Sequence, residues 1–365
     1  MEPLQLKDFT NEAGENGVSR FNSLGHFTAS ARMRKWIPTT VSPILRYDDT
    51  QSSTPSIELP VPAKLMSKSI LPLNTAVKTA LAKARANGFI RFEDLPEPWK
   101  INQYVVSGYR FHATIPECLI SMIRLSNESF NIWSHISGGI FVAAIAFFYY
   151  PLTEQYRQSS TSDVIVAAVF LVSACLCMLC SVMWHTFKSI AEREAMHTFA
   201  SVDMIGVTIL LTASAMMTEY AAFYCDRPWQ MFYISLTCAF GLNGIILPWV
   251  PKFRHPDAAW TRVIFFSCLG LTGVLPVIHI IMTRGWPSML ALYRPMGGVV
   301  SPIIGGAVIY ASKFPEVFWP GRFDFLGSSH NLWHIAVLVG IIRGYFAMQN
   351  LYLEAFNRAR DNVCM

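Results

Sequence analysis

Three histidines stand at the ends of apolar stretches, where imidazole groups could bind a metal ion. His330 and His334 begin the last apolar stretch and are four residues apart, while His185 closes an earlier stretch. A spacing of four places His330 and His334 on one face of a helix. Asp203 opens the stretch that follows His185. Three imidazoles beside a carboxylate suit a zinc ion with one open coordination position.

An open position on zinc has a defined chemistry. A water bound there has a pKa of about 7, and the resulting hydroxide can attack an amide carbonyl that the metal polarises. Asp203 is the candidate to steer or deprotonate this water. Ser181, four residues before His185 and on the same helical face, could hydrogen-bond the water or the oxyanion. The alternative is a zinc that only ties two helices together.

The composition indicates a membrane protein. Only 15% of the 365 residues are charged and 52% are hydrophobic, whereas soluble domains carry about 25% charged residues. The net charge of +5 is too modest for a nucleic-acid-binding surface. Five cysteines within apolar stretches are interpreted as small packing residues, namely Cys175, Cys177, Cys180, Cys238 and Cys268.

The apolar stretches predict an all-α integral membrane protein, a bundle of seven transmembrane helices with an internal zinc site. Most reach the roughly 20 residues that a spanning helix needs. The sixth is the weakest because it is rich in Gly and Pro, which membrane helices tolerate where neighbours pack closely. The stretches cover about 131–150, 164–185, 201–218, 229–249, 260–283, 297–312 and 331–352.

The Lys and Arg residues of the short loops predict the orientation. Ten lie on one side and six on the other, which puts the N-terminus in the cytosol and the C-terminus outside the cell or in a lumen. In such a bundle, His185, Asp203, His330 and His334 share one membrane depth, near the cytosolic leaflet. The expected location is the plasma membrane or the endoplasmic reticulum.

The chain divides into four predicted parts. Residues 1–95 form a cytosolic region, largely disordered, with an amphipathic basic helix near 72–92 that either lies on a membrane or packs on its own domain. Residues 96–130 form a pre-membrane segment, 131–355 the bundle and 356–365 a short tail. The sequence starts without an apolar h-region, so no cleavable signal peptide is expected.

Further side chains are candidates for a role near the site. Glu128 and His135, near the start of the first stretch, lie at the level of the metal ligands. Glu128, Asn131 and Trp133 could support these ligands or clamp the loop onto the bundle. Arg262 could pair with a lipid headgroup or a fatty-acid carboxylate, or it could be an ordinary cytosolic anchor. Arg343 lies roughly 13 Å deeper than His334, where it either snorkels outward or lines a cavity that holds lipid.

Several motifs, in order, resemble the progestin and adipoQ receptor family, which includes the adiponectin receptors and haemolysin-III-like proteins. The resemblance runs from about residue 95 to the end of the chain. The motifs are Leu95-Pro96-Glu97-Pro98-Trp99, Ser107-Gly108-Tyr109-Arg110, Asn127-Glu128-Ser129-Phe130-Asn131-Ile132-Trp133-Ser134-His135, Ser181-Val182-Met183-Trp184-His185, Asp203-Met204-Ile205-Gly206, Phe314-Pro315-Glu316, Pro320-Gly321-Arg322-Phe323-Asp324 and Ser329-His330-Asn331-Leu332-Trp333-His334.

This resemblance implies seven helices with the N-terminus inside, a zinc held by His185, His330 and His334, and a bound water oriented by Asp203. The family is linked to lipid signalling, metal homeostasis and ceramidase-like hydrolysis, and its fungal members to zinc and sterol regulation. Membrane lipids such as ceramide, a fatty acid or a sterol are therefore the expected ligands, together with an extracellular ligand and a cytosolic partner.

Two other functions compete with zinc-dependent hydrolysis of a lipid amide. One is a receptor without enzymatic activity, in which the zinc is structural. The other is a metal sensor or transporter that regulates zinc or sterol levels. Transport needs ionisable residues along the whole membrane path, whereas here they cluster at one end, which disfavours a zinc channel.

Overall fold

The computed structural model describes residues 73–254 and 259–361, which fold almost entirely into helices. The predicted disorder of the N-terminal region falls mainly outside these residues. The helices are α1 (Leu73–Asn87), α2 (Ile115–Ser121), α3 (Ser129–Ala144), α4 (Glu154–Gln158), α5 (Thr161–Phe187), α6 (Arg193–Ala222), α7 (Arg227–Ile246), α8 (Pro251–Arg254), α9 (Ala259–Thr272), α10 (Val274–Ser312) and α11 (Ser329–Arg360).

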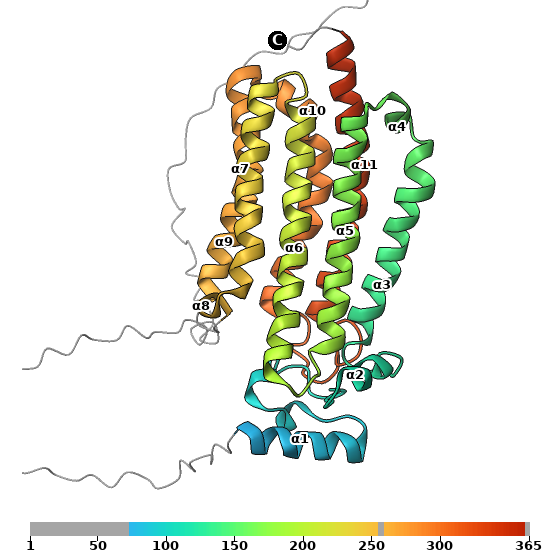
Figure 1. Ribbon diagram of the computed structural model, residues 1–365, viewed down its shortest axis with the longest axis vertical. Coiled ribbons are helices and arrows are strands. Elements are labelled where there is room, and N and C mark those ends of the chain that lie inside the picture. Colours follow the sequence, from blue (N-terminus) through green and yellow to red (C-terminus); the bar gives the residue numbers. More distant parts are fainter. Residues whose placement is uncertain (1–72, 255–258, 362–365) are drawn as a thin grey trace, which may run out of the picture. The chain divides into compact units, whose positions relative to one another are not determined.

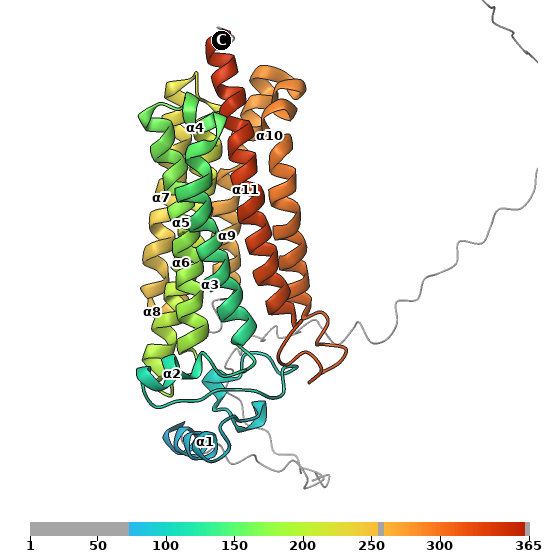
Figure 2. The same ribbon diagram turned by 90° about the vertical axis from the view of Figure 1, so that its right-hand side faces the viewer.

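Within the described ranges, six helical segments are long and apolar enough to cross a membrane. They run side by side in a bundle, with α1 and α2 at one end and the end of α11 at the other (Figures 1 and 2). The segments are Ser129–Leu152, Thr161–Phe187, Arg193–Ala222, Arg227–Trp249, Ile264–Ser312 and Ser329–Arg360. The first continues α3 through a π-helical and a 3₁₀ turn.

The fifth segment combines two predicted stretches in one helical run. Its 49 residues would measure about 74 Å as a straight helix, more than twice the roughly 30 Å of a bilayer core. Gly285 interrupts it with a φ of 77°, a backbone conformation that glycine adopts without steric cost. The chain rises beside α7 and returns beside α11 (Figures 1 and 2).

Small residues let neighbouring helices approach closely, as membrane helices require. A Cβ atom added to Gly206 on α6 would lie 2.7 Å from the Cβ of Cys180 on α5. A Cβ on Gly306 of α10 would lie 2.4 Å from that of Ala336 on α11. The glycines of the sixth predicted stretch therefore include one in a tight helix contact. Five cysteines predicted as packing residues, together with Cys118, are free thiols.

A smaller apolar core covers the end of the bundle where α5 ends and α6 begins. Ala80 and Ala84 of α1 are buried in it with Trp99 and Phe111. The indole nitrogen of Trp99 donates a hydrogen bond to the carbonyl oxygen of Ile190 at 3.0 Å. Helix α1 therefore packs on its own domain, which was one of the two alternatives for the amphipathic segment near 72–92.

Candidate metal centre

Three histidine side chains meet at this end of the bundle. His185 lies in the last turn of α5, and His330 and His334 lie in the first two turns of α11. The Nε2 atom of His185 is 3.1 Å from that of His330 and 3.1 Å from that of His334, and the other two are 3.2 Å apart. His185 and His334 are buried and His330 is half-buried. The predicted convergence of these residues is confirmed.

Glu128, the residue before α3, fixes the orientation of His185. Its Oε2 accepts hydrogen bonds from His185 Nδ1 at 2.7 Å and from Asn131 Nδ2 at 2.9 Å. Its Oε1 accepts from the Nζ of Lys188 at 2.6 Å. Burial by itself would raise the pKa of Glu128, but Lys188 and His185 hold it well below its usual range. Its contribution to stability is therefore full at neutral pH and is lost only as the pH falls below the usual carboxyl range.

The donor set fits a zinc ion. With the Nδ1 proton of His185 donated to Glu128, the Nε2 atom of a neutral ring carries a lone pair directed at the other two histidines. Ligand atoms of a tetrahedral zinc at about 2.0–2.1 Å lie roughly 3.3 Å apart, close to the observed spacing. A carboxylate behind a metal-binding histidine is a common arrangement that raises ligand basicity. The side chains of His185, His330 and His334 are thus compatible with zinc.

Replacing Glu128 with alanine is expected to weaken zinc binding about 10- to 100-fold. The substitution removes the acceptor that orients His185 and leaves the Lys188 ammonium without its partner. Titration of the purified protein against a zinc-chelating dye would measure the change. Glu97→Ala is a suitable control because Glu97 forms an exposed ion pair with Lys100. Equal zinc affinity in wild type and Glu128→Ala would contradict a positioning role for this carboxylate.

The two residues predicted to act on a bound water lie on α5 and α6. Ser181 is on α5, one turn before His185, and Asp203 is on α6. Ser181 is buried, and Asp203 is half-buried. The Asp203 carboxyl group is near enough to His185 for the two to interact electrostatically. The roles predicted for Asp203 and Ser181 stay predictions.

His135 completes the wall of the site on α3. Its ring stacks on that of His334, with centroids 3.8 Å apart and an angle of 22° between the planes. Neither ring nitrogen of His135 has a hydrogen-bond partner among the described residues. The ring therefore supports His334 by packing. Asn131, one turn earlier, accepts a hydrogen bond from Asn331 at 2.7 Å and so ties the start of α3 to the start of α11.

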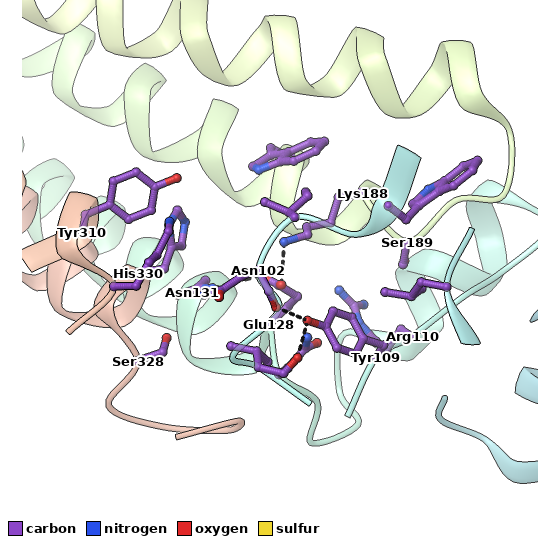
Figure 3. A pocket seen from close by; sticks show the side chains of 17 residues that line it. Asn102, Tyr109, Arg110, Glu128, Asn131, Lys188, Ser189, Tyr310, Ser328 and His330 are labelled. Atoms are coloured by element: carbon purple, nitrogen blue, oxygen red, sulfur yellow. Dashed lines mark hydrogen bonds and ion pairs between the residues drawn. The ribbon is translucent and has the colours of Figure 1, made fainter. Parts of the chain in front are cut away.

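A cavity of about 150 Å³ leads to His330 from the side of the pre-membrane segment (Figure 3). Three cationic side chains, those of Arg110, Lys188 and Lys313, line it together with Glu128. Burial lowers the pKa of Lys313, and its ammonium lies 4.0 Å from the centroid of the Tyr310 ring. The cavity is large enough for several water molecules, and His330 is part of its wall.

Of the two predicted lipid-binding arginines, Arg343 has a described side chain, and it does not line the cavity that leads to His330. The side chain of Arg262 falls outside the part of the chain that the structure describes. Arg343 is exposed on α11, and its Cδ atom lies beside Gly298 of α10. Among the described residues Arg343 has no ion-pair partner, in agreement with the absence of a neighbouring acid in the sequence.

Two acidic residues of the loop between α10 and α11 clamp the pre-membrane segment in place. Asp324 accepts hydrogen bonds from the backbone amides of Val106 and Ser107 at 2.8 and 2.9 Å. Glu316 accepts from the side chain of Asn102 and from the amide of Ser329 at the start of α11. Sequence reasoning did not give these two a role, although both lie in motifs of the resemblance.

Comparisons with known proteins find a family and several relatives to which this chain is similar. The model of the Haemolysin-III related family matches residues 123–345. An uncharacterised protein of Schizosaccharomyces pombe is 35% identical over 81% of this chain and 68% of its own length. The ADIPOR-like receptor IZH3 of Saccharomyces cerevisiae is 30% identical over 73% of this chain, which spans only 60% of that protein. Progestin and adipoQ receptor family member 3 of mouse is 29% identical over 68% of this chain and 81% of its own.

Proposed function

The chain belongs to the Haemolysin-III related family and is a multi-pass integral membrane protein of the adiponectin-receptor type, and from this premise we propose that it binds zinc and hydrolyses a lipid amide such as ceramide. The observation that carries the proposal is the convergence of the three imidazole Nε2 atoms. His185, His330 and His334 would hold the zinc. The role is that of a receptor-like protein in lipid signalling and in lipid and metal homeostasis.

The proposed topology has seven spans, with the histidines at the cytosolic end. The segment Ile264–Ser312 would cross twice, because it is too long for one crossing and turns at Gly285. Lys and Arg cluster at the histidine end, as cytosolic loops require. Cys225, in the loop between α6 and α7 at the opposite end, is disulfide-bonded, which suits an extracellular or lumenal environment. The plasma membrane or the endoplasmic reticulum fits this topology.

The position of the histidines favours a lipid substrate. They lie at the ends of membrane-spanning helices, the depth at which the polar linkage between a lipid's chains and its headgroup resides. Bound zinc would lower the pKa of a water to about 7 and polarise the amide carbonyl. The Asp203 carboxylate accepts a proton from the attacking water and returns it to the leaving amine. The Ser181 hydroxyl donates a hydrogen bond to the carbonyl oxygen as negative charge develops on it.

The reaction breaks the amide C–N bond and forms a C–O bond, with water as the co-substrate. Ceramide would give a fatty acid and a sphingoid base. The cationic side chains of Lys188 and Lys313 near His330 attract a carboxylate product. Membrane lipids are therefore the proposed ligands.

Release of fatty acid from ceramide tests this function. The purified protein would be reconstituted in liposomes with ceramide, and the fatty acid would be measured by mass spectrometry. We expect release that stops with a zinc chelator and resumes when zinc is restored. Zinc-loaded protein that releases no fatty acid from lipid amides would contradict hydrolysis and favour the alternative, a receptor with a structural zinc.

A further inference from the structure

A second basic cavity lies beside the pre-membrane segment. It shares no lining residue with the cavity that leads to His330. It has a volume of about 250 Å³ and is bounded by α1, the backbone around His112 and α2. Its lining includes the charged side chains of Arg85, Glu117 and Arg124, the imidazole of His112 and several apolar side chains, among them Ile120. The cavity is open to its surroundings at one side. None of these residues takes part in the proposed zinc chemistry.

The polar groups of this cavity suit an anion with several oxygens. Arg85 and Arg124 are exposed and have no ion pair or side-chain hydrogen bond within the described part of the chain. The carboxylate of Glu117 is engaged, because one of its oxygens accepts the backbone amides of Ala113 and Thr114. The cavity therefore has two guanidinium groups and one carboxylate, and the carboxylate already accepts backbone hydrogen bonds. Guanidinium groups bind phosphate oxygens well.

His112 adds a third donor. Its backbone is fixed, since its amide donates to Ser189 and its carbonyl accepts from Ala191. Its Nε2 atom is buried and has no hydrogen-bond partner among the described residues. Burial, aided by the charge of Arg110, lowers the pKa of His112, so the ring is neutral at pH 7 and can donate one hydrogen bond. The neutral ring keeps one N–H, and no described residue accepts a hydrogen bond from the His112 side chain.

An apolar shelf borders the cavity. Leu119, Ile120, Ile123 and Leu125 are all exposed, Ile120 by 64% and Ile123 by 80%. They lie just before α3, beside the start of the bundle (Figure 1). Trp133 donates its indole N–H to the carbonyl of Met122 at 3.2 Å, which places a tryptophan at the level where such rings mark the membrane surface. These exposed apolar side chains suit a segment that lies in the membrane interface.

We propose that this cavity binds the phosphate group of an anionic phospholipid, with Arg85 and Arg124 as the charged contacts and His112 as a neutral donor. The apolar shelf favours a phospholipid over free phosphate because acyl chains can cover Ile120 and its exposed neighbours. The basic residues are on the side that the topology assigns to the cytosol, where anionic lipids are concentrated. The bound lipid would anchor α1 and α2, and with them the pre-membrane segment that lines the cavity near His330.

Binding of short-chain lipids to the full-length protein tests this site. Thermophoresis in a zwitterionic detergent would compare dioctanoyl phosphatidic acid, dioctanoyl phosphatidylcholine and inorganic phosphate. We expect phosphatidic acid to bind most tightly, and the double variant Arg85→Gln/Arg124→Gln to bind it about tenfold or more weakly. The charge-conserving variant Arg85→Lys/Arg124→Lys should retain much of the affinity and shows that the substitutions leave the fold intact.

A charge-matched control separates this site from general attraction to a basic surface. Lys78→Gln/Arg91→Gln removes two charges from the same region, from exposed residues that do not line the cavity, and should bind like wild type. Unchanged binding by Arg85→Gln/Arg124→Gln would overturn the proposal. An equal loss of affinity for phosphatidic acid in the control variant would overturn it too. The same holds if inorganic phosphate binds as tightly as the lipid.

Discussion

Replacing His334 with alanine is expected to remove zinc from the protein and to abolish its hydrolytic activity. His334 is buried and its Nε2 atom lies within 3.2 Å of the other two. Two histidines leave the ion one ligand short of the three protein ligands that a catalytic zinc site supplies. The loss of affinity should therefore exceed the roughly 10- to 100-fold effect of removing an outer partner.

Elemental analysis of the purified variant measures this loss, and thermal unfolding measures its consequence. Added zinc should raise the melting temperature of wild type, because a ligand that binds only the folded state stabilises it. It should leave the variant unchanged. His279→Ala is the matched control, since His279 is a membrane histidine whose Nδ1 lies 2.9 Å from the hydroxyl of Tyr233, away from the site. A zinc content in His334→Ala equal to that of wild type would contradict the proposed ligand set.

Replacing Asp203 with asparagine is expected to lower the rate of lipid-amide hydrolysis by about 10²- to 10⁴-fold while zinc stays bound. The amide has the shape of the carboxylate but cannot accept a proton, and general-base catalysis contributes a factor of this size. The kinetic effect should therefore appear without loss of the fold.

Fatty-acid release and zinc content, measured on the same preparation, distinguish a catalytic zinc from one that only ties two helices together. Glu219→Gln is the control, because Glu219 is a buried carboxyl on the same helix, hydrogen-bonded to Thr237, with no part in the proposed reaction. A wild-type rate in Asp203→Asn would exclude it as the base and would favour a zinc that only ties α5 to α11.

The meeting of the three histidines could be predicted because membrane helices restrict where side chains can lie. Spans that alternate in direction bring the end of one and the start of another to the same depth, so His185 and His334 had to be level. The i, i+4 spacing then placed His330 on the face of His334. Depth and helical face were enough to identify the cluster without knowledge of its distances.

The supporting contacts could not be derived in the same way. From the sequence, Glu128 could either support the metal ligands or clamp a loop. Only the direction of its side chain in the structure shows that it supports His185. The bonds of Asp324 to Val106 and Ser107 join residues more than 200 positions apart. No local pattern encodes such a pairing. The join of two predicted stretches at Gly285 depends likewise on packing against neighbouring helices.

X-ray absorption at the zinc edge of the purified full-length protein would show whether the three histidines bind zinc. We expect about one zinc per chain with nitrogen ligands at about 2.0–2.1 Å, and the loss of this signal in His185→Ala. Protein that is well folded yet free of zinc would contradict it. So would a spectrum dominated by sulfur neighbours at about 2.3 Å, because that would place the metal on cysteines instead of His185, His330 and His334.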